Sequence, residues 1–396
     1  MLVFFSSFGQ TFVVSLYIPW FLEEFDISRS FFSGMYAVAT LGSAATIIFV
    51  GKKIDHVPLK NFTLFVVFGI MLACLTAAFS MHLFMLFIAI YLLRFFGQGL
   101  LGHTAMTTMA RYFRKARGKA LSVAYLGFPL GEALFPVLVI SLILAVGWRQ
   151  TFGLSAVFIL LVLLPLSIYL MKGFSASTVV EEYEAPPEKP GREEEQPAWR
   201  QSKIIANPWF YLFAPTVFLV GFLQTALFFF QTFIAEYKGW AMEWMAGSIT
   251  AYALASFSCA ILAGPLIDKL SARRLFPFTL LPLGAGVLVL SLSNHPAIAP
   301  LYWLLVGITG GMNGPVVSAL YAEVYGTRSL GAVRSIFTFV MVVSTALGPV
   351  VYSFFLERGF TFDHIHLAVV AVLLLNMIYI LVLGRKLWQK TSTGKS

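Results

Sequence analysis

Charged residues are scarce in this chain of 396 residues. Asp, Glu, Lys and Arg make up 11% of it, and apolar residues make up 59%. A water-soluble chain carries about 25% charged residues, so the composition excludes a soluble globular protein. The 27 basic and 18 acidic residues give a net charge of +9, but these charges lie in short segments between apolar runs. A basic nucleic-acid-binding domain is therefore excluded as well.

Cysteine and cofactor-binding motifs are also scarce. Cys74 and Cys259 both lie inside apolar runs, which excludes a disulfide framework and a cysteine metal site, and His364 with His366 is too small a set for a metal. The sequence lacks a Walker-type loop and a nucleophile–base cluster, so we expect no cofactor, no direct use of ATP and no enzyme activity. Met1 leads straight into apolar sequence without a cleavable signal, and we expect the natural start to lie upstream.

Apolar runs of about 20 residues recur along the chain, as a hydrocarbon core about 30 Å thick requires of a spanning helix. They predict an all-α membrane protein with twelve transmembrane helices. The expected spans are residues 2–22, 31–50, 62–80, 83–110, 120–146, 151–171, 208–234, 246–266, 276–293, 298–322, 335–356 and 364–383.

A segment rich in proline and acidic residues separates the sixth and seventh spans. Residues 172–207 lack periodicity and predict a solvated linker between six-helix bundles at 1–171 and 208–384, with a tail at 385–396. A cytoplasmic linker places most Lys and Arg residues, including those of 111–119, on the same side of the membrane. By the positive-inside rule both termini are cytoplasmic. We expect a monomer in the plasma (inner) membrane.

An internal repeat relates the two halves. A shift of 213 residues, without a gap, aligns Glu23 with Glu236, Gly34 with Gly247, Gly51 with Gly264, Asp55 with Asp268, Gly97 with Gly310, Gly118 with Gly331, Ser122 with Ser335, and Pro136 with Pro349. Because six helices separate equivalent positions, both halves have the same orientation in the membrane. Parallel six-helix repeats are an architecture of secondary transporters.

Three motifs carry a family resemblance. The loop after the second span reads GKKIDHVPLK from Gly51 to Lys60, and its repeat copy reads GPLIDKLSAR from Gly264 to Arg273. Both resemble the Gly-x-x-x-Asp-Arg-x-Gly-Arg-Lys/Arg signature of the major facilitator superfamily, although Pro58 and Ser271 replace its second glycine. The sequence RFFGQG from Arg94 to Gly99 resembles the fourth-helix arginine motif of that superfamily. Residues 112–131 are loosely similar to the fifth-helix signature of the monocarboxylate transporter group.

The resemblance implies a gating role for the two copies of the loop. Its members here are Gly51, Asp55 and Arg111 in the first copy, and Gly264, Asp268 and Arg273 in the second. An aspartate at a cytoplasmic helix end can pair with a neighbouring helix start or with a nearby arginine such as Arg111. The alternative is that both are ordinary loop aspartates.

Arg94 and Glu132 are the two formal charges expected deep in the membrane. Arg94 lies about ten residues into the fourth span, roughly 15 Å from its end. A charge at that depth costs several kcal/mol, so each must face a partner or a wet cavity. The two side chains either pair as a structural strut, or Arg94 attracts an anionic solute while Glu132 carries a coupling proton. His103 is either a hydrogen-bonded neutral histidine or a proton relay.

Uncharged polar residues concentrate in the first, fourth, seventh and tenth spans. Those that we expect to bind the solute are Gln10, Thr11, Gln98, Gln224, Gln231 and Asn313, together with Arg94. A lipid-facing helix cannot satisfy amide groups, whereas a helix that lines a wet cavity can. The resemblance implies that these four helices line the cavity. For any single amide, the alternative is a hydrogen bond between helices.

The sequence therefore predicts a secondary active transporter that works by alternating access. We expect its partners to be the lipid bilayer and a small solute, an organic anion such as a monocarboxylate, moved with protons as in a symporter. One alternative is an efflux transporter of the same fold for drugs and other amphiphiles, favoured by 40 phenylalanines. The other is a transport-silent membrane sensor or scaffold.

Overall fold

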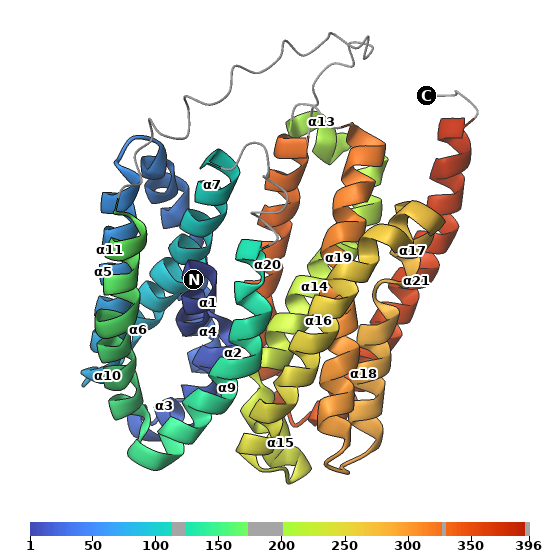
Figure 1. Cartoon of the computed structure of the whole chain (residues 1–396). Helices are drawn as coiled ribbons and strands as arrows, with labels where there is room; N and C mark the ends of the chain where they lie inside the picture. The colour runs from blue at the N-terminus through green and yellow to red at the C-terminus, as the bar shows by residue number, and fades with distance from the viewer. Residues whose placement is uncertain (113–122, 173–200, 327–329, 393–396) are drawn as a thin grey trace. The chain divides into compact units, whose positions relative to one another are not determined.

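The computed structural model describes residues 1–112, 123–172, 201–326 and 330–392, and every regular element in these ranges is a helix (Figure 1). The first repeat contains α1 (Leu2–Phe5), η1 (Ser6–Gly9), α2 (Thr11–Val14), η2 (Ser15–Tyr17), α3 (Ile18–Phe25), α4 (Arg29–Val50), η3 (Gly51–Asp55), α5 (Leu59–Ala78), α6 (Leu83–Leu92), η4 (Leu93–Leu101), α7 (Gly102–Tyr112), α9 (Gly127–Val146), α10 (Trp148–Phe158), η5 (Ile159–Leu163) and α11 (Leu164–Leu170).

The second repeat contains α13 (Gln201–Ala206), α14 (Pro208–Phe229), α15 (Gln231–Lys238), α16 (Met242–Leu270), α17 (Ala272–Leu275), η6 (Phe276–Phe278), α18 (Leu281–Leu292), α19 (Ile298–Tyr325), α20 (Leu330–Glu357) and α21 (Phe362–Ser392). Of the expected linker, residues 173–200 lie outside the described part of the chain, and Gln201–Ala206 is helical. The expected tail is also helical as far as Ser392.

The prediction of an all-α membrane protein is confirmed. Within the described ranges, eleven helices are long and apolar enough to span a membrane, or twelve when one bent pair counts as a span. That pair is Leu2–Gly9 with Thr11–Phe25, which meet at a bend of 47°. The first expected span is therefore interrupted, whereas the helices that contain Pro136 and Pro349 continue through both prolines.

Local sequence explains several helix ends. The Asn207 side chain caps α14 by accepting a hydrogen bond from the backbone N–H of Trp209 at 3.0 Å, and Pro208 follows at the first helical position. Gly239 ends α15 with a φ of 70°, a left-handed conformation that glycine adopts at little cost. These signals fix where the chain leaves one span and enters the next.

Contacts within the chain define two compact units, and the boundary between them does not follow the repeats. Unit 1 comprises residues 1–10, 42–128 and 149–199, and unit 2 comprises residues 11–41, 129–148 and 200–396. Two segments of the first repeat, Thr11–Leu41 and Pro129–Trp148, thus belong to the same unit as the whole second repeat. The expected six-helix bundles at 1–171 and 208–384 divide the chain by its internal repeat rather than by these contacts. They stay a prediction.

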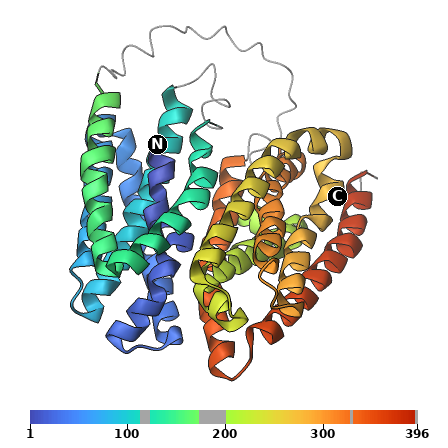
Figure 2. The same cartoon turned by 60° about the horizontal axis from the view of Figure 1, so that its bottom comes forward.

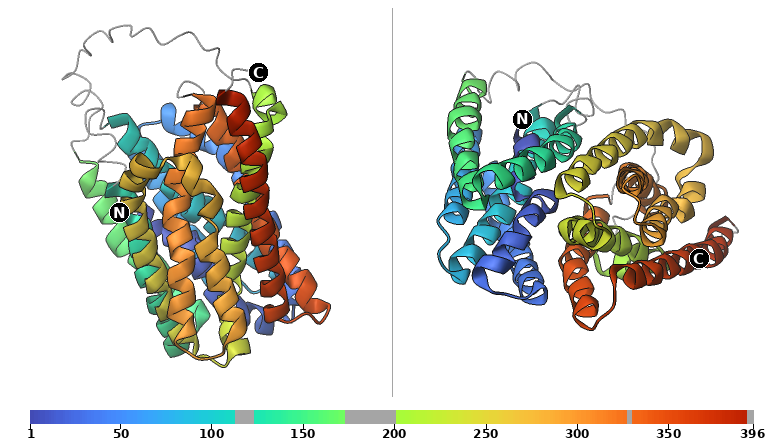
Figure 3. Two further views of the ribbon diagram at one scale, coloured as in Figure 1. Left: turned by 90° about the vertical axis from the view of Figure 1, so that its right-hand side faces the viewer. Right: turned by 90° about the horizontal axis from the view of Figure 1, so that it is seen from below.

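Each unit has its own helix packing. In unit 2, α16 packs against α19, α14 against α20, and α18 against both α19 and α21 (Figures 1 and 3). In unit 1, α5 packs against α6, η4 and α11, and the contact between α5 and α11 can be followed between the blue and green helices of Figure 2. A further contact in unit 1 joins η1 to η4 and brings the interrupted first span against the motif that contains Arg94.

Candidate functional site

The first span breaks at Gly9 and Gln10. The chain is a 3-10 helix over Ser6–Gly9, becomes extended at Gln10 with φ −78° and ψ 151°, and resumes as an α-helix at Thr11. Such a break removes backbone hydrogen bonds from the helix, and in a membrane the freed groups need other partners. Interrupted helices of this kind form ion and solute sites in secondary transporters.

Arg94 supplies one of these partners within unit 1. Its Nη1 donates a hydrogen bond to the Gly9 carbonyl at 3.0 Å, and its side chain is 1% exposed. Arg94 lies near the start of η4, a π-helical stretch of the fourth span. Such stretches are rare and often mark functional sites. Sequence reasoning placed Arg94 deep in the membrane, but it did not identify the Gly9 carbonyl as a partner.

Two glycines make this contact possible. A Cβ on Gly97 would lie 2.7 Å from both the nitrogen and the Cα of Gly9, and a Cβ on Gly9 would lie 2.6 Å from the backbone nitrogen of Gln98. The backbones of η1 and η4 therefore touch, which only glycine permits. This approach brings the backbone of Gln98 against Gly9, the residue that precedes Gln10 in the chain. Both glutamines are half-buried. Unit 1 thus gathers Arg94, Gln98 and Gln10.

The two candidates for proton coupling occupy different surroundings. Glu132 lies on α9 in unit 2 and is half-buried, and its neighbour Ala133 accepts a hydrogen bond from the Thr250 hydroxyl at 3.3 Å. Its pairing with Arg94, which lies in unit 1, stays a prediction. His103 lies on α7, and its Nε2 is 3.3 Å from the Gly51 carbonyl. This contact joins α7 to the η3 loop and fits the hydrogen-bonded alternative, and a relay role stays a prediction.

Unit 2 contains a second group of polar atoms. A Cβ on Gly310 would lie 2.8 Å from the Tyr252 hydroxyl and 3.2 Å from the Gln224 Nε2, so these groups meet at α19. Within the described ranges, the buried Gln224 Nε2 and the buried Asn313 Oδ1 have no hydrogen-bond partner. Buried polar atoms are normally satisfied, so these two amides are suited to bind water or a solute.

Aromatic rings border this group. The Phe228 ring stacks on Trp303 with centroids 4.5 Å apart, and Tyr252 meets Phe228 edge-on at 5.1 Å. The Trp303 Nε1 is also without a hydrogen-bond partner in the described part of the chain. Phe228, Tyr252 and Trp303 come from α14, α16 and α19, so three helices supply one aromatic wall beside the amides.

Gln231 and Thr11 make contacts of another kind in unit 2. Gln231 is fully buried, and its Nε2 donates to the Phe12 carbonyl at 2.9 Å and to the Ser15 Oγ at 2.7 Å. The Thr11 hydroxyl bonds to the Tyr36 hydroxyl at 2.8 Å. Sequence reasoning grouped both residues with the solute ligands. In this structure Gln231 joins the second repeat to the first, and Thr11 joins two spans of the first repeat.

These contacts belong to a larger surface in unit 2, which we call the inter-repeat seam. Its first-repeat residues are Phe12, Ser15, Arg29, Ser30, Phe32 and Tyr36, and its second-repeat residues are Phe228, Phe229, Gln231, Phe233, Ser353 and Glu357. Sequence reasoning named Gln231 as a solute ligand and did not predict the seam. The spacing of Phe32 and Tyr36 on one face of a helix was a signal that could have indicated it.

Aromatic contacts and hydrogen bonds make up most of the seam. The Phe229 ring lies 5.1 Å from Tyr36 and 6.0 Å from Phe32, and the Arg29 guanidinium lies 4.4 Å from the centre of the Phe233 ring. At the end of α20, the Glu357 carboxylate accepts a hydrogen bond from the backbone N–H of Ser30 at 3.2 Å. The seam therefore joins α2, η2 and α4 to α14, α15 and α20.

An ion pair fixes α15 to the start of α21 in the same unit. The Lys238 ammonium lies 2.8 Å from Asp363 and is almost fully buried, and the Tyr237 hydroxyl donates to the other Asp363 oxygen at 2.9 Å. Burial raises the pKa of the Tyr237 phenol above its usual value, so the phenol keeps the proton that it donates.

The candidate gating residues are described in part. Gly51 lies in η3 against His103, whereas the side chains of Asp55 and Arg111 lie outside the described residues. In the second copy, Gly264 and Asp268 are exposed on α16. Arg273 of α17 donates to Glu323 of α19 at 2.9 Å and lies 4.2 Å from the centre of the Trp388 ring. A gating role for these residues stays a prediction.

Comparison with known proteins agrees with the fold. The family model described as Major Facilitator Superfamily matches residues 1–250 and 242–395. A Multidrug resistance protein B homolog of Mycobacterium tuberculosis is 28% identical over 120 residues, which is 30% of this chain and 22% of that protein. The MFS transporter asaE of Aspergillus flavus is 25% identical over 324 residues, which is 76% of this chain and 65% of that protein. Both matches thus span less than two thirds of the relative's length.

Solved structures show the same fold at low identity. A bacterial homolog to the human lysosomal transporter Spinster, described as inward-facing and unoccupied, has a TM-score of 0.69 and 14% identity, and the match covers 96% of this chain and 92% of that one. A mutant of the nucleoside transporter NupG has a TM-score of 0.73 and 11% identity, with 96% and 97% covered. At such identities the likeness concerns the fold alone.

Proposed function

Because the chain belongs to the major facilitator superfamily of membrane transporters, we propose that it moves a small organic anion, such as a monocarboxylate, by alternating access. Its family and fold are those of multi-pass membrane transporters rather than of enzymes. The identity of the solute, the coupling ion and the transport mechanism are proposals. So are the inner-membrane location, the cytoplasmic termini and the monomeric state.

The observation that carries the anion proposal is the buried Arg94 at the break of the first span. The Arg94 side chain is 1% exposed, and arginine is not deprotonated in proteins, so it is a buried cation. The Gly9 carbonyl that it holds is a neutral acceptor. A carboxylate is a stronger, charge-assisted acceptor, and it can replace the carbonyl in a bidentate pair. An anion would reach Arg94 when the break opens, so binding and conformational change would be coupled.

Amide groups supply the hydrogen bonds in this scheme. Gln98 and Gln10 adjoin the break in unit 1, and Gln224 and Asn313 carry unpartnered polar atoms within the described part of unit 2. We assign Gln231 to the contacts that hold the closed state, because its hydrogen bonds join the two repeats. We assign Thr11 to the packing of the first repeat, because its hydroxyl bonds to that of Tyr36. Glu132 is the proposed proton carrier, since a half-buried carboxyl in a membrane helix is a site for reversible protonation.

The inter-repeat seam supports the alternating-access part of the proposal. By the positive-inside rule it lies on the outer side of the membrane, so its contacts would close the outer end of the path. Opening the seam would then admit solute from outside. On the cytoplasmic side, the proposed gate consists of the loop copies with Gly51, Asp55 and Arg111, and with Gly264, Asp268 and Arg273.

The test is anion binding and uptake by Arg94 variants. Purified protein is screened by thermal shift against a library of organic anions, and the best ligand is then followed in proteoliposomes. Arg94→Ala is expected to weaken binding about tenfold or more, because a hydrogen bond to a charged group contributes roughly 1.5–3 kcal/mol. Arg94→Lys keeps the charge and part of the affinity. Arg274→Ala, which removes an exposed arginine of α17, is the matched control.

Unchanged affinity and uptake in folded Arg94→Ala would remove the anion proposal. A pH-independent affinity in both the parent and Glu132→Gln would remove proton coupling. Comparing the melting temperatures of the variants without ligand separates a folding defect from a loss of recognition.

A second candidate is efflux of amphiphilic compounds. The stacked wall of Phe228, Tyr252 and Trp303 favours it, because aromatic faces bind apolar and cationic compounds. The similarity to a protein named as a multidrug resistance homolog points the same way over 30% of the chain. Stabilisation by lipophilic cations and by no anion in the same screen would favour this candidate over the first.

A further inference from the structure

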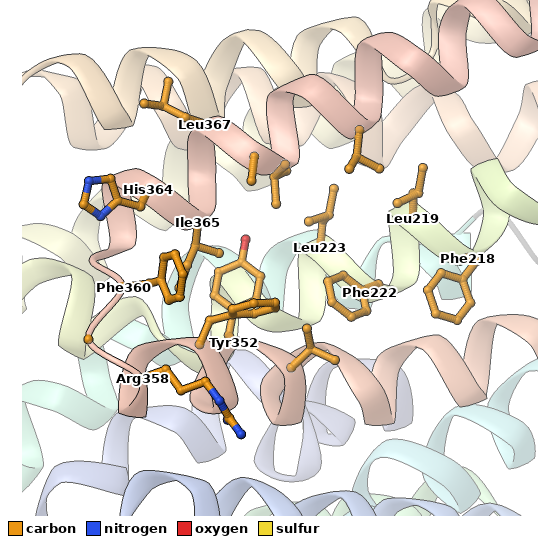
Figure 4. A pocket seen from close by; sticks show the side chains of 16 residues that line it. Phe218, Leu219, Phe222, Leu223, Tyr352, Arg358, Phe360, His364, Ile365 and Leu367 are labelled. Carbon is orange, nitrogen blue, oxygen red and sulfur yellow. The ribbon is translucent and has the colours of Figure 1, made fainter.

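An apolar groove runs along the second repeat. It has a volume of about 750 Å³ and lies between α14, α20 and α21, with Phe218, Phe222, Tyr352, Phe355 and Ile365 among the side chains that form it (Figure 4). This volume is within the range of about 300–1,000 Å³ that is usual for small-molecule sites. A second cavity of about 610 Å³ shares Phe218 with it and continues along the same helices. We call the two cavities together the lateral groove.

The lateral groove opens on a surface suited to lipid. Its three helices are long and apolar enough to span the membrane. At its margin Leu367 is 45% exposed, Val372 47% and Phe355 39%. Apolar cavities do not hold water, and hydrocarbon side chains cannot satisfy a polar solute. The physical match for the long part of the groove is therefore an acyl chain.

A positive charge lies at one end of the lateral groove. Arg358, in the turn between α20 and α21, is exposed, and its guanidinium lies 3.3 Å from the centre of the Phe354 ring. The nearby carboxylates of Glu357 and Asp363 are engaged by Ser30 and by Lys238. Within the described ranges, Arg358 forms no salt bridge. A cation at the end of an apolar groove complements an anionic lipid headgroup.

Tyr352 contributes a polar atom to the lining of the lateral groove. Tyr352 is 1% exposed, and its hydroxyl has no hydrogen-bond partner within the described part of the chain. In Figure 4 this hydroxyl is directed between Ile365 and Leu223. Tyr352 precedes Arg358 by six residues, which is about 9 Å along a helix. In a phospholipid the ester oxygens lie deeper in the membrane than the headgroup. One lipid could therefore place its headgroup at Arg358 and an ester oxygen near the Tyr352 hydroxyl.

We propose that the lateral groove binds an anionic membrane phospholipid, with one acyl chain along α14 and the phosphate at Arg358. The proposal does not depend on the identity of the transported solute.

The site adjoins the inter-repeat seam through α20. Ser353 and Glu357 contact the first repeat from one side of this helix, while Tyr352, Phe355 and Arg358 face the groove from another. A lipid that fills the groove would hold the end of α20 in place. It would thereby stabilise the closed seam.

The test compares two phospholipids with identical acyl chains. Full-length protein in a neutral detergent is titrated with phosphatidylglycerol or phosphatidylcholine, and bound lipid is counted by native mass spectrometry. Phosphatidylglycerol is expected to bind more tightly. Arg358→Gln is expected to weaken it about fivefold, as the loss of one arginine at a charged lipid surface predicts, and to leave phosphatidylcholine unchanged. Ala368→Trp, which fills the groove from α21, is expected to reduce binding of both lipids.

Arg274→Gln is the control, because this exposed arginine lies on α17, away from the lateral groove. Equal binding of the two lipids by the parent, or no effect of Arg358→Gln, would overturn the headgroup assignment. Undiminished binding by Ala368→Trp would overturn the groove as the site. If Arg274→Gln weakened phosphatidylglycerol binding as much as Arg358→Gln does, the effect would be a general attraction between charges. That result would also overturn the headgroup assignment. Melting temperatures of the lipid-free variants exclude misfolding as the cause.

Discussion

Gln231→Leu tests whether the inter-repeat seam is a gate that opens. Leucine has a similar size but lacks the amide that donates to the Phe12 carbonyl and the Ser15 hydroxyl. Each hydrogen bond contributes about 1 kcal/mol, so the closed seam should lose about 2 kcal/mol. The Gln231 Oε1 has no partner within the described ranges, and its removal offsets part of the cost of leaving the Phe12 carbonyl unpaired. A loss of 2 kcal/mol raises the open population about 30-fold.

A cysteine in the seam reports the open population. Ser353→Cys introduces it at a fully buried position of α20, in a protein whose Cys74 and Cys259 are replaced by alanine. A membrane-impermeant maleimide, applied from the outer side, should label this cysteine about 30-fold faster when Gln231→Leu is added. Gln150→Leu, at an exposed glutamine of α10, is the matched control and should not change the rate. If labelling in Gln231→Leu stays within about twofold of its parent, the seam does not gate the path.

Two further substitutions test the packing that supports the site. Gly97→Ala should prevent folding or lower the melting temperature sharply, because the new Cβ would lie 2.7 Å from Gly9. The control is Gly153→Ala, whose Cβ would have no atom within 4 Å. It should be neutral or slightly stabilising in the same melting experiment. Asp363→Asn should destabilise the protein by about 3 kcal/mol, since it leaves the buried Lys238 ammonium without its anion, and an unchanged denaturation midpoint would contradict this.

Much of the fold was predictable because membrane spans have strong local signals. Length, apolarity and the 213-residue repeat gave the twelve spans, counting the bent first span as one. The break at Gly9 and Gln10 was not predictable, since it lacks a proline and coincides with a contact between Gly9 and Gly97. Such a contact joins distant parts of the chain and leaves no periodic signal.

The sequence predicted which residues belong to the candidate site better than it predicted which atoms those residues contact. The cost of a charge in lipid predicted that Arg94 lies deep in the membrane and faces a partner or a wet cavity. In the structure its side chain is buried and donates to the Gly9 carbonyl, which became available only through the break. Gln231 was recognised as an amide that needs a partner. Its partners in α2 and η2 could not be predicted. The internal repeat shows which positions of the two halves are equivalent, but it does not show which residues of one half contact the other.

Locking the seam with a cross-link tests whether the protein works by alternating access. Ser30→Cys and Glu357→Cys are combined in protein without Cys74 and Cys259, because the Ser30 nitrogen and the Glu357 carboxylate are 3.2 Å apart. A short bifunctional thiol reagent joins the two cysteines, and uptake of the best anion from the thermal-shift screen is measured in proteoliposomes. Cross-linking is expected to abolish uptake, and reduction is expected to restore it. Uptake by the cross-linked protein at the rate of the reduced protein would show that the seam does not open during transport.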